Sequence, residues 1–210
     1  MKQITTTFAL IASVSVSHAA FVLVPNGDFE TAAGDSWNQG ASGGTVIDYP
    51  ATGGNTGGYG RIDNTAGAWG GVLVAEGGSG ASPAVGGGIP LGDLSLVAGS
   101  AYAFSLDMIS LGGTTDIGGI KIESWSETGA ISDSGDRDFA ITSNWDTYTT
   151  NYTIDAAATR IKFVPLYAEG AAGGNIVGFD NVGVENNVPE PSSALLGLSA
   201  LALLGLRRRK

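Results

Sequence analysis

The chain has 210 residues, a formal net charge of -10, no cysteine and a single histidine, His18. His18 falls in a segment that reads as a removable leader, so the mature chain would lack both His and Cys. This excludes Ser-His-Asp and Cys-His nucleophile systems and the usual zinc sites, and without cysteine no disulfide can form even along an oxidising export route.

Residues 1–19 are predicted to be a signal peptide. Lys2 provides a positive start, residues 8–16 form an apolar stretch, and residues 17–19 make a small-x-small site. We therefore expect signal peptidase to cut before Ala20. A buried N-terminal helix is the alternative, which the β-branched residues of this run disfavour.

Residues 20–187 are predicted to form one domain, which is more acidic than the whole chain. They hold 19 of the 20 acidic residues but 5 of the 10 basic residues, a net charge of -14. The negative electrostatic field of this charge repels phosphate backbones and anionic lipid, so we expect no nucleic-acid partner. The same field attracts divalent cations.

Short β-rich runs separated by glycine-rich turns fill this domain. Tyr102, Phe104, Leu106 and Met108 alternate with small or polar residues, as in a half-buried strand. Further runs are 45–49, 71–75, 120–123, 138–142, 146–154, 160–168 and 176–184. About nine to eleven strands of this kind predict an all-β fold, an antiparallel two-sheet jelly-roll sandwich. A parallel β-solenoid is the alternative, although no fixed internal period supports it. Residues 77–88 and 109–119 are predicted to be long loops.

Two short acidic motifs stand near the two ends of the domain. The first is Asn26-Gly27-Asp28-Phe29-Glu30, followed by Trp37, and the second is Gly178-Phe179-Asp180-Asn181-Val182. Together with Trp145 and Tyr148 they resemble the calcium-containing jelly-roll carbohydrate-binding modules of the galactose-binding-like fold. In that family the first and last strands lie side by side, and carboxylates from both bind one structural Ca²⁺.

The resemblance implies that Glu30 and Asp180 are calcium ligands, with Asp28 as a further ligand and carbonyl groups from residues 52–58. The local pattern adds support. The apolar residues of the last strand alternate on one face before Asp180-Asn181 and on the other face after it. This change predicts a β-bulge, which would redirect the Asp180 carboxylate. The alternative is that Asp28 and Asp180 form turns and Glu30 is a solvated strand residue. A second acidic cluster, residues 133–138, lacks EF-hand spacing and is predicted to be a solvated hairpin loop.

Sugar recognition needs aromatic rings that stack on pyranose C–H faces, with polar groups beside them. Trp125 falls on the same side of its predicted strand as Lys121 and Glu123, which places it on a polar face. Trp69 is a second candidate, beside a predicted cleft with Tyr59 and Arg61. A partly exposed packing role is the alternative for both tryptophans. Trp37 and Trp145 are predicted to lie in the core.

The sequence carries no nucleophile elbow, phosphate-binding loop or dinucleotide glycine pattern. Glu123 and Glu127 are the nearest suggestion of a glycosidase pair, but Glu127 falls in a predicted turn. We therefore expect no enzyme activity, with a small glycan-active enzyme as a distant alternative.

Residues 188–210 form the C-terminal segment. Pro189, Glu190 and Pro191 interrupt any helix or strand, the uncharged run 192–206 follows, and Arg207, Arg208, Arg209 and Lys210 end the chain. A 15-residue helix spans about 22 Å, less than the ~30 Å hydrocarbon core unless snorkelling arginines extend it.

This order of breaker, apolar helix and basic tail resembles the PEP-CTERM sorting signal of Gram-negative bacteria. The resemblance implies recognition by an exosortase, cleavage near Pro189 to Pro191, and delivery to the cell surface or extracellular matrix. The alternative is a tail anchor that stays in the membrane. The sequence thus predicts an exported, non-catalytic sandwich that binds polysaccharide and meets the membrane only through its C-terminal helix. A structural or adhesive matrix protein without a sugar site is the second hypothesis.

Overall fold

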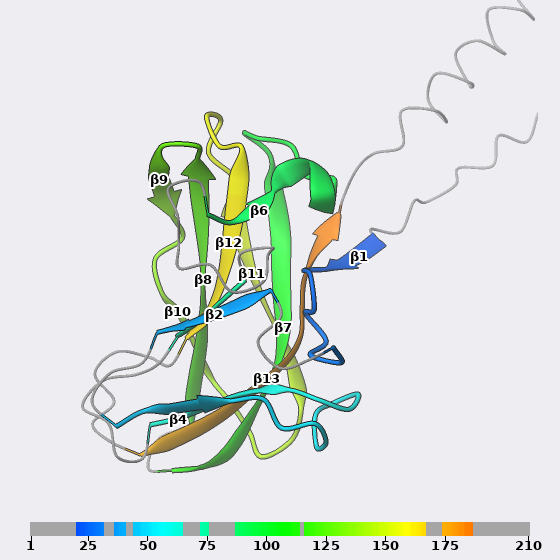
Figure 1. The fold of residues 1–210 in the computed structure, drawn as a ribbon, viewed down its shortest axis with the longest axis vertical. Coiled ribbons are helices and arrows are strands. Elements are labelled where there is room, and N and C mark those ends of the chain that lie inside the picture. The colour runs from blue at the N-terminus through cyan, green and yellow to red at the C-terminus, as the bar shows by residue number, and fades with distance from the viewer. Residues whose placement is uncertain are drawn as a thin grey trace, which may run out of the picture. The chain divides into compact units, whose positions relative to one another are not determined.

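The computed structural model describes residues 20–31, 36–40, 44–64, 72–75, 87–113, 116–166 and 174–186. They belong to one compact unit, Ala20–Asn186, and form two antiparallel sheets packed face to face (Figure 1). The predicted signal peptide and C-terminal helix lie outside the described residues. Within the described part, no helix is long and apolar enough to cross a membrane.

The first sheet, sheet A, has the strand order β11-β7-β13-β4-β3, and β1 also pairs with β13. Its strands are β1 (Ala20–Leu23), β3 (Val46–Asp48), β4 (Gly60–Asp63), β7 (Ala101–Gly113), β11 (Asp146–Thr153) and β13 (Asn175–Asn186). The first and last strands of the domain therefore lie side by side, as predicted (Figure 1).

The second sheet, sheet B, has the order β10-β8-β12-β5-β2, with β6 paired to β12 and β9 paired to β8. Its strands are β2 (Trp37–Gly40), β5 (Val72–Ala75), β6 (Ile89–Pro90), β8 (Ile117–Ser126), β9 (Gly129–Asp133), β10 (Arg137–Ala140) and β12 (Arg160–Leu166). A 3-10 helix, η1 (Leu91–Leu94), follows β6. The two sheets confirm the predicted antiparallel sandwich.

The core lies between the sheets and follows from the alternation along β7. Phe104, Leu106 and Met108 are fully buried on its inner face. The ring of Phe104 meets Phe163 of β12 edge-on, with centroids 5.3 Å apart, and so joins the two sheets. Each fully buried side chain of this size contributes about 1.5–3 kcal/mol. Trp37 is also a core residue, as predicted, and stacks on Phe29 at 4.9 Å.

The strand β13 changes the face that it turns to the core halfway along its length. Phe179 is buried before the change and Val182 after it. The register with β7 shifts between Asp180 and Gly183, and Asn181 adopts a left-handed φ of 48°. This is the predicted bulge, and it leaves Asp180 on the outer face of sheet A.

The prediction of a loop at residues 109–119 is wrong at both ends. β7 continues to Gly113, and β8 begins at Ile117. Gly112 and Gly113 pair with β13 although both have a φ of 131°, a conformation that favours glycine. An irregular glycine strand of this kind has the composition of a loop, so the composition misled the prediction.

The acidic residues of segment 133–138 are exposed, as predicted, but the segment is not a hairpin loop. Both β9 and β10 pair antiparallel with β8 along one edge. Between them, the backbone N–H of Ser134 donates to the carbonyl of Ile122 at 2.9 Å, and its hydroxyl oxygen accepts from the Ile122 N–H at 3.0 Å. The chain therefore keeps its direction through this segment.

Candidate functional site

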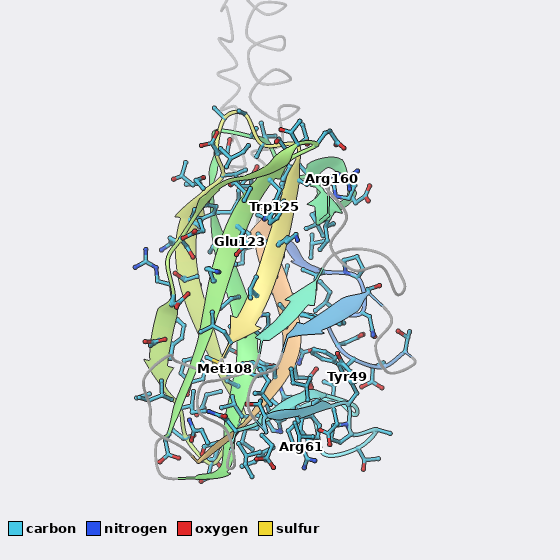
Figure 2. All side chains as sticks on the ribbon, turned by 60° about the vertical axis from the view of Figure 1, so that its left-hand side comes forward. Tyr49, Arg61, Met108, Glu123, Trp125 and Arg160 are labelled. Carbon is cyan, nitrogen blue, oxygen red and sulfur yellow. The ribbon has the colours of Figure 1, made fainter. Side chains whose placement is uncertain are left out.

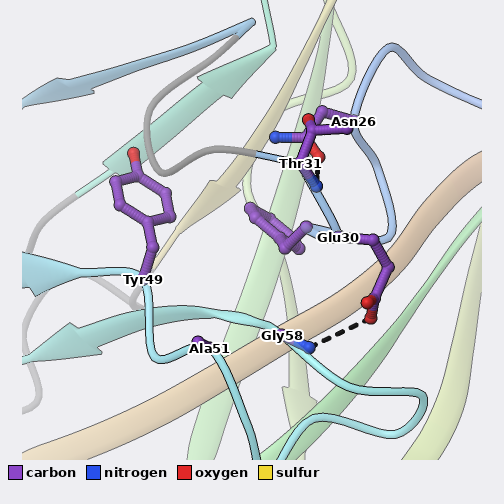
Figure 3. Close-up of a pocket in the computed structure, with 7 residues that line it drawn as sticks. Asn26, Glu30, Thr31, Tyr49, Ala51 and Gly58 are labelled. Carbon is purple, nitrogen blue, oxygen red and sulfur yellow. Dashed lines mark hydrogen bonds between the residues drawn. The ribbon is translucent and has the colours of Figure 1, made fainter.

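Two carboxylates from opposite ends of the domain lie against one glycine-rich loop. The loop, residues 51–58, lies between β3 and β4. Glu30 Oε1 accepts a hydrogen bond from the Gly58 backbone N–H at 3.0 Å (Figure 3), and Asp180 Oδ2 accepts one from Thr56 at 3.2 Å. The structure thus brings two of the three predicted ligands to the predicted loop.

Backbone geometry lets the loop approach these carboxylates closely. Gly57 has a φ of 139°, and a Cβ at this position would stand 2.2 Å from Glu30 Oε1. No other residue type could occupy the position without displacing the carboxylate or straining the backbone. Gly57 therefore positions the Glu30 carboxylate against the loop.

The Asp180 carboxyl is fully buried. Desolvation raises its pKa to about 6, and the nearby charge of Asp107 adds to the rise, while backbone N–H groups of residues 181, 56 and 55 oppose it. Burial makes the ionised form costly without a nearby cation. A bound cation would offset that cost.

Asp28 has a different local role. It is half-buried at the end of the turn that follows β1, and its Oδ1 lies 3.4 Å from the Glu30 backbone N–H, which donates to it. In the described ranges, no three His, Cys, Asp or Glu side chains gather closely enough to hold a metal. Glu30, Asp180 and backbone carbonyls of the loop would offer only hard oxygen ligands, which suit Ca²⁺ better than softer metals.

A cavity of about 260 Å³ opens beside Glu30 (Figure 3). It is lined by Asn26, Phe29, Glu30, Thr31, Tyr49, Ala51 and Gly58. The Tyr49 hydroxyl is buried without a hydrogen-bond partner among the described residues, and burial raises the pKa of Tyr49 to about 12. Tyr49 therefore stays neutral over the whole physiological range.

A separate polar cluster stands on the outer face of sheet B, where Trp125 projects from β8. Glu123 Oε2 accepts from the indole N–H at 2.9 Å, and Glu123 Oε1 pairs with the Lys121 ammonium at 2.9 Å. The Lys162 ammonium lies 3.8 Å from the centroid of the Trp125 ring. Figure 2 shows Trp125 close to Glu123 and to Arg160, its register partner on β12.

Both signs of charge are present in this cluster. Burial lowers the pKa of Lys121, but the hydrogen bond to Glu123 and the charge of that carboxylate raise it overall. One face of the indole is occupied by the Lys162 ammonium, an attraction worth about 0.5–2 kcal/mol. The cluster therefore combines a half-buried aromatic ring with charged hydrogen-bonding groups.

Residues 187–210 match the family model of the PEP-CTERM protein-sorting motif. The chain ends in a PEP-CTERM sorting motif. The match contains Pro189, Glu190, Pro191 and the terminal basic residues, and it confirms the predicted sorting segment. No curated protein matches the chain in sequence.

The described sandwich resembles solved carbohydrate-binding modules. A family 4 carbohydrate-binding module superposes with a TM-score of 0.51 at 18% identity, covering 77% of this chain and 98% of the module. The xylan-binding CBM22-1 domain of Paenibacillus barcinonensis Xyn10C gives 0.50 at 13% identity, covering 81% and 97%. These likenesses confirm the jelly-roll fold.

Larger enzymes contain the same fold. An arabinose-bound α-L-arabinofuranosidase of the GH51 type superposes with a TM-score of 0.55 at 13% identity, covering 80% of this chain but 26% of the enzyme. This chain therefore corresponds to about a quarter of that protein.

Of the other predicted ligand residues, Tyr59 directly precedes β4 and Arg61 lies within it, in sheet A, whereas Trp125 is in sheet B. Tyr59 is 8% exposed and packs edge-on against Trp145, with centroids 5.7 Å apart, so its ring is not an open platform. Arg61 lies in sheet A, where its guanidinium holds the Asp48 carboxylate. Trp69 lies outside the described residues.

Sequence reasoning missed Asp107, which stands at the centre of the loop contacts. Its Oδ2 accepts from the side-chain amides of Asn55 at 2.7 Å and Asn181 at 2.8 Å, and its Oδ1 accepts from the Thr147 hydroxyl at 2.5 Å. Because Asp107 alternates with the buried residues of β7, the sequence places it on the outer face of the strand. No neighbouring residue in the sequence indicates that the loop between β3 and β4 covers this position.

Proposed function

We propose that this chain is an exported, surface-sorted, non-catalytic sandwich that binds extracellular polysaccharide through the outer face of sheet B. The observation that carries the proposal is the cluster of Trp125, Glu123, Lys121 and Lys162 on a fold of the carbohydrate-binding-module type. An aromatic ring beside charged hydrogen-bonding groups is the chemistry that a pyranose requires.

In this proposal a sugar ring stacks on the indole face opposite the Lys162 ammonium. Glu123 accepts hydrogen bonds from the hydroxyl groups of the sugar, and Lys121 donates hydrogen bonds to them. The pairing of these two residues orders both before the sugar arrives, which reduces the entropy that binding would cost.

A glycan array followed by titration of the best ligand tests this function. We expect Trp125→Ala to weaken binding about tenfold, equivalent to about 1.4 kcal/mol. Ile131→Ala is the control, because Ile131 is 37% exposed on the neighbouring strand β9 and lies outside the cluster. Failure to bind any glycan at millimolar concentration would contradict the proposal.

The second hypothesis, a structural or adhesive matrix protein without a sugar site, is favoured by one observation. Lys162 already contacts the ring of Trp125, and Glu123 already accepts a hydrogen bond from its indole N–H. Under this hypothesis Trp125→Ala lowers stability and leaves glycan binding absent throughout, so stability and binding measured on the same variant distinguish the two functions.

We also propose that Glu30, Asp180 and carbonyls of residues 52–58 bind one structural Ca²⁺. The ion would tie the loop to the first and last strands and neutralise the buried Asp180. At a calcium concentration 100 times its Kd the ion would stabilise the fold by about 2.7 kcal/mol, a rise in melting temperature of roughly 5–10 °C.

Thermal unfolding with chelator and with added calcium tests this site. We expect chelator to lower the melting temperature and calcium to restore it, and Glu30→Gln to reduce the difference. Asp93→Asn is the matched control, because Asp93 is exposed on η1. An unchanged transition in chelator would remove the calcium site from the proposal.

Processing by an exosortase near Pro189 to Pro191 completes the proposed route. Until that cut the C-terminal helix would hold the protein in the inner membrane. Mass spectrometry of the surface protein distinguishes the outcomes: a C-terminus near residue 190 supports cleavage, and an intact Lys210 supports a permanent tail anchor.

A further inference from the structure

The two sheets differ in the charge of their strands. Those of sheet A carry six carboxylates and one arginine, and those of sheet B carry four basic and three acidic residues. The sheet A residues are Asp48, Arg61, Asp63, Asp107, Asp146, Asp180 and Glu185. Asp146 is the register partner of the inward-facing Met108. The other five carboxylates share the outer face of sheet A with Arg61, which Asp48 engages, so this face has an unbalanced negative charge.

A groove of about 410 Å³ lies on this acidic face, opposite the Trp125 cluster. Its volume falls within the roughly 300–1,000 Å³ of small-ligand sites. Side chains from β1, β7, β11 and β13 line it: Phe21, Leu23, Ser105, Asp107, Thr147, Asn181 and Glu185. Apolar and acidic groups therefore meet in one depression.

Phe21 forms the apolar wall of the groove. The residue is 46% exposed, and its ring lies over Gly183, where a Cβ would stand 2.5 Å from the ring tip. The glycine thus leaves the space that the ring occupies on the sheet surface. β1 and β13 lie side by side (Figure 1). Phe21 and Glu185 are direct register partners on these strands, so an aromatic ring and a carboxylate share one face of the sheet.

The two carboxylates of the groove have different surroundings. Asp107 is 5% exposed, and its three hydrogen bonds hold it in place at the base. Glu185 is half-buried, and its side chain makes no hydrogen bond or ion pair with any described residue. A ligand cation would therefore pair with Glu185 and gain from the fixed charge of Asp107.

We propose that this groove binds an amino sugar with a free ammonium group, as in a de-N-acetylated glucosamine polysaccharide. The ring of Phe21 would contact the C–H face of the sugar and attract the ammonium, while Glu185 would accept its hydrogen bonds. A neutral sugar uses the ring but not the charge, and an anionic sugar is repelled. The site is separate from the Trp125 cluster, so a chain with both sites would link two polysaccharide strands.

Titration of the full chain in mild detergent with tetrameric oligosaccharides tests the inference. The probes are a glucosamine tetramer in mildly acidic buffer, its fully N-acetylated counterpart, and spermidine as a cation without a sugar ring. We expect the glucosamine tetramer to bind at least about tenfold more tightly than either, and its affinity to fall as salt rises from about 50 to 200 mM.

Two conservative variants locate the binding. We expect Glu185→Gln to weaken glucosamine binding about fivefold and Phe21→Leu about threefold, the usual effects of one partly buried ion pair and one cation–π contact. Asp93→Asn and Val97→Ala are exposed controls that should leave the affinity unchanged. Unchanged melting temperatures show that the variants fold.

Trp125→Ala separates this inference from the proposed function, and it should leave glucosamine binding intact. The inference is overturned if the N-acetylated tetramer or spermidine binds equally well, if Glu185→Gln has no effect, or if Trp125→Ala alone abolishes binding. In the last case the sheet B site takes the amino sugar and the proposed function stands.

Discussion

Replacing Asp107 tests how the loop over sheet A is held. The side chain accepts three charge-assisted hydrogen bonds, each worth about 1.5–3 kcal/mol with fully buried partners. Asn55 and Thr147 are exposed and can turn to water, whereas Asn181 is half-buried. Removal of Asp107 also relieves its repulsion with Asp180. We therefore expect Asp107→Ala to cost about 2–4 kcal/mol of unfolding free energy.

The isosteric variant separates hydrogen bonding from charge. Asp107→Asn retains one carbonyl oxygen, which can still accept from both asparagine amides, so we expect a cost of about 1 kcal/mol. Urea unfolding followed by tryptophan fluorescence measures both values, and Asp107→Ala should lower the melting temperature by roughly 5–15 °C. The reasoning would be refuted if Asp107→Ala lowered the unfolding free energy by less than about 1 kcal/mol, or if Asp107→Asn lowered it more than Asp107→Ala does.

Three further variants test other parts of the domain. Gly57→Ala should destabilise by about 1–3 kcal/mol, because its Cβ would clash with Glu30 at a φ of 139°, and thermal unfolding should also become insensitive to chelator. Phe163→Ala should cost about 3–5 kcal/mol in urea unfolding, since the ring is fully buried against Phe104, and a cost near 1 kcal/mol would mean that the core collapses around the gap. Tyr49→Phe should leave stability at neutral pH unchanged or higher, because the hydroxyl has no partner among the described residues. The same variant should lose less stability than the wild type in alkali. The pKa of Tyr49 is about 10 in the unfolded chain and about 12 in the folded one, so the wild type loses stability as the pH rises between these values. Identical alkaline unfolding of both proteins would contradict the burial of the hydroxyl.

Local patterns along the chain account for much of this architecture. The alternation from Tyr102 to Met108 defined the inner face of β7, and the change of parity around Asp180 located the bulge in β13. Both features are encoded by neighbouring residues, because side chains alternate across a strand whatever its partner is. The sorting motif is equally local and needs no fold to be recognised.

The contacts of the candidate sites depend on strand register, which no local pattern contains. Only the pairing of β7 with β13 sets Asp107 opposite Asp180, and only the path of the loop between β3 and β4 covers them both. In the same way, the pairing of β12 with β8 brings Lys162 over Trp125. Composition and short-range order are enough to predict the sorting segment, the β class and the acidity of the domain. Which carboxylates meet, and how charge divides between the two sheets, depend on the fold, because strands distant in the chain become neighbours only when the sheets form.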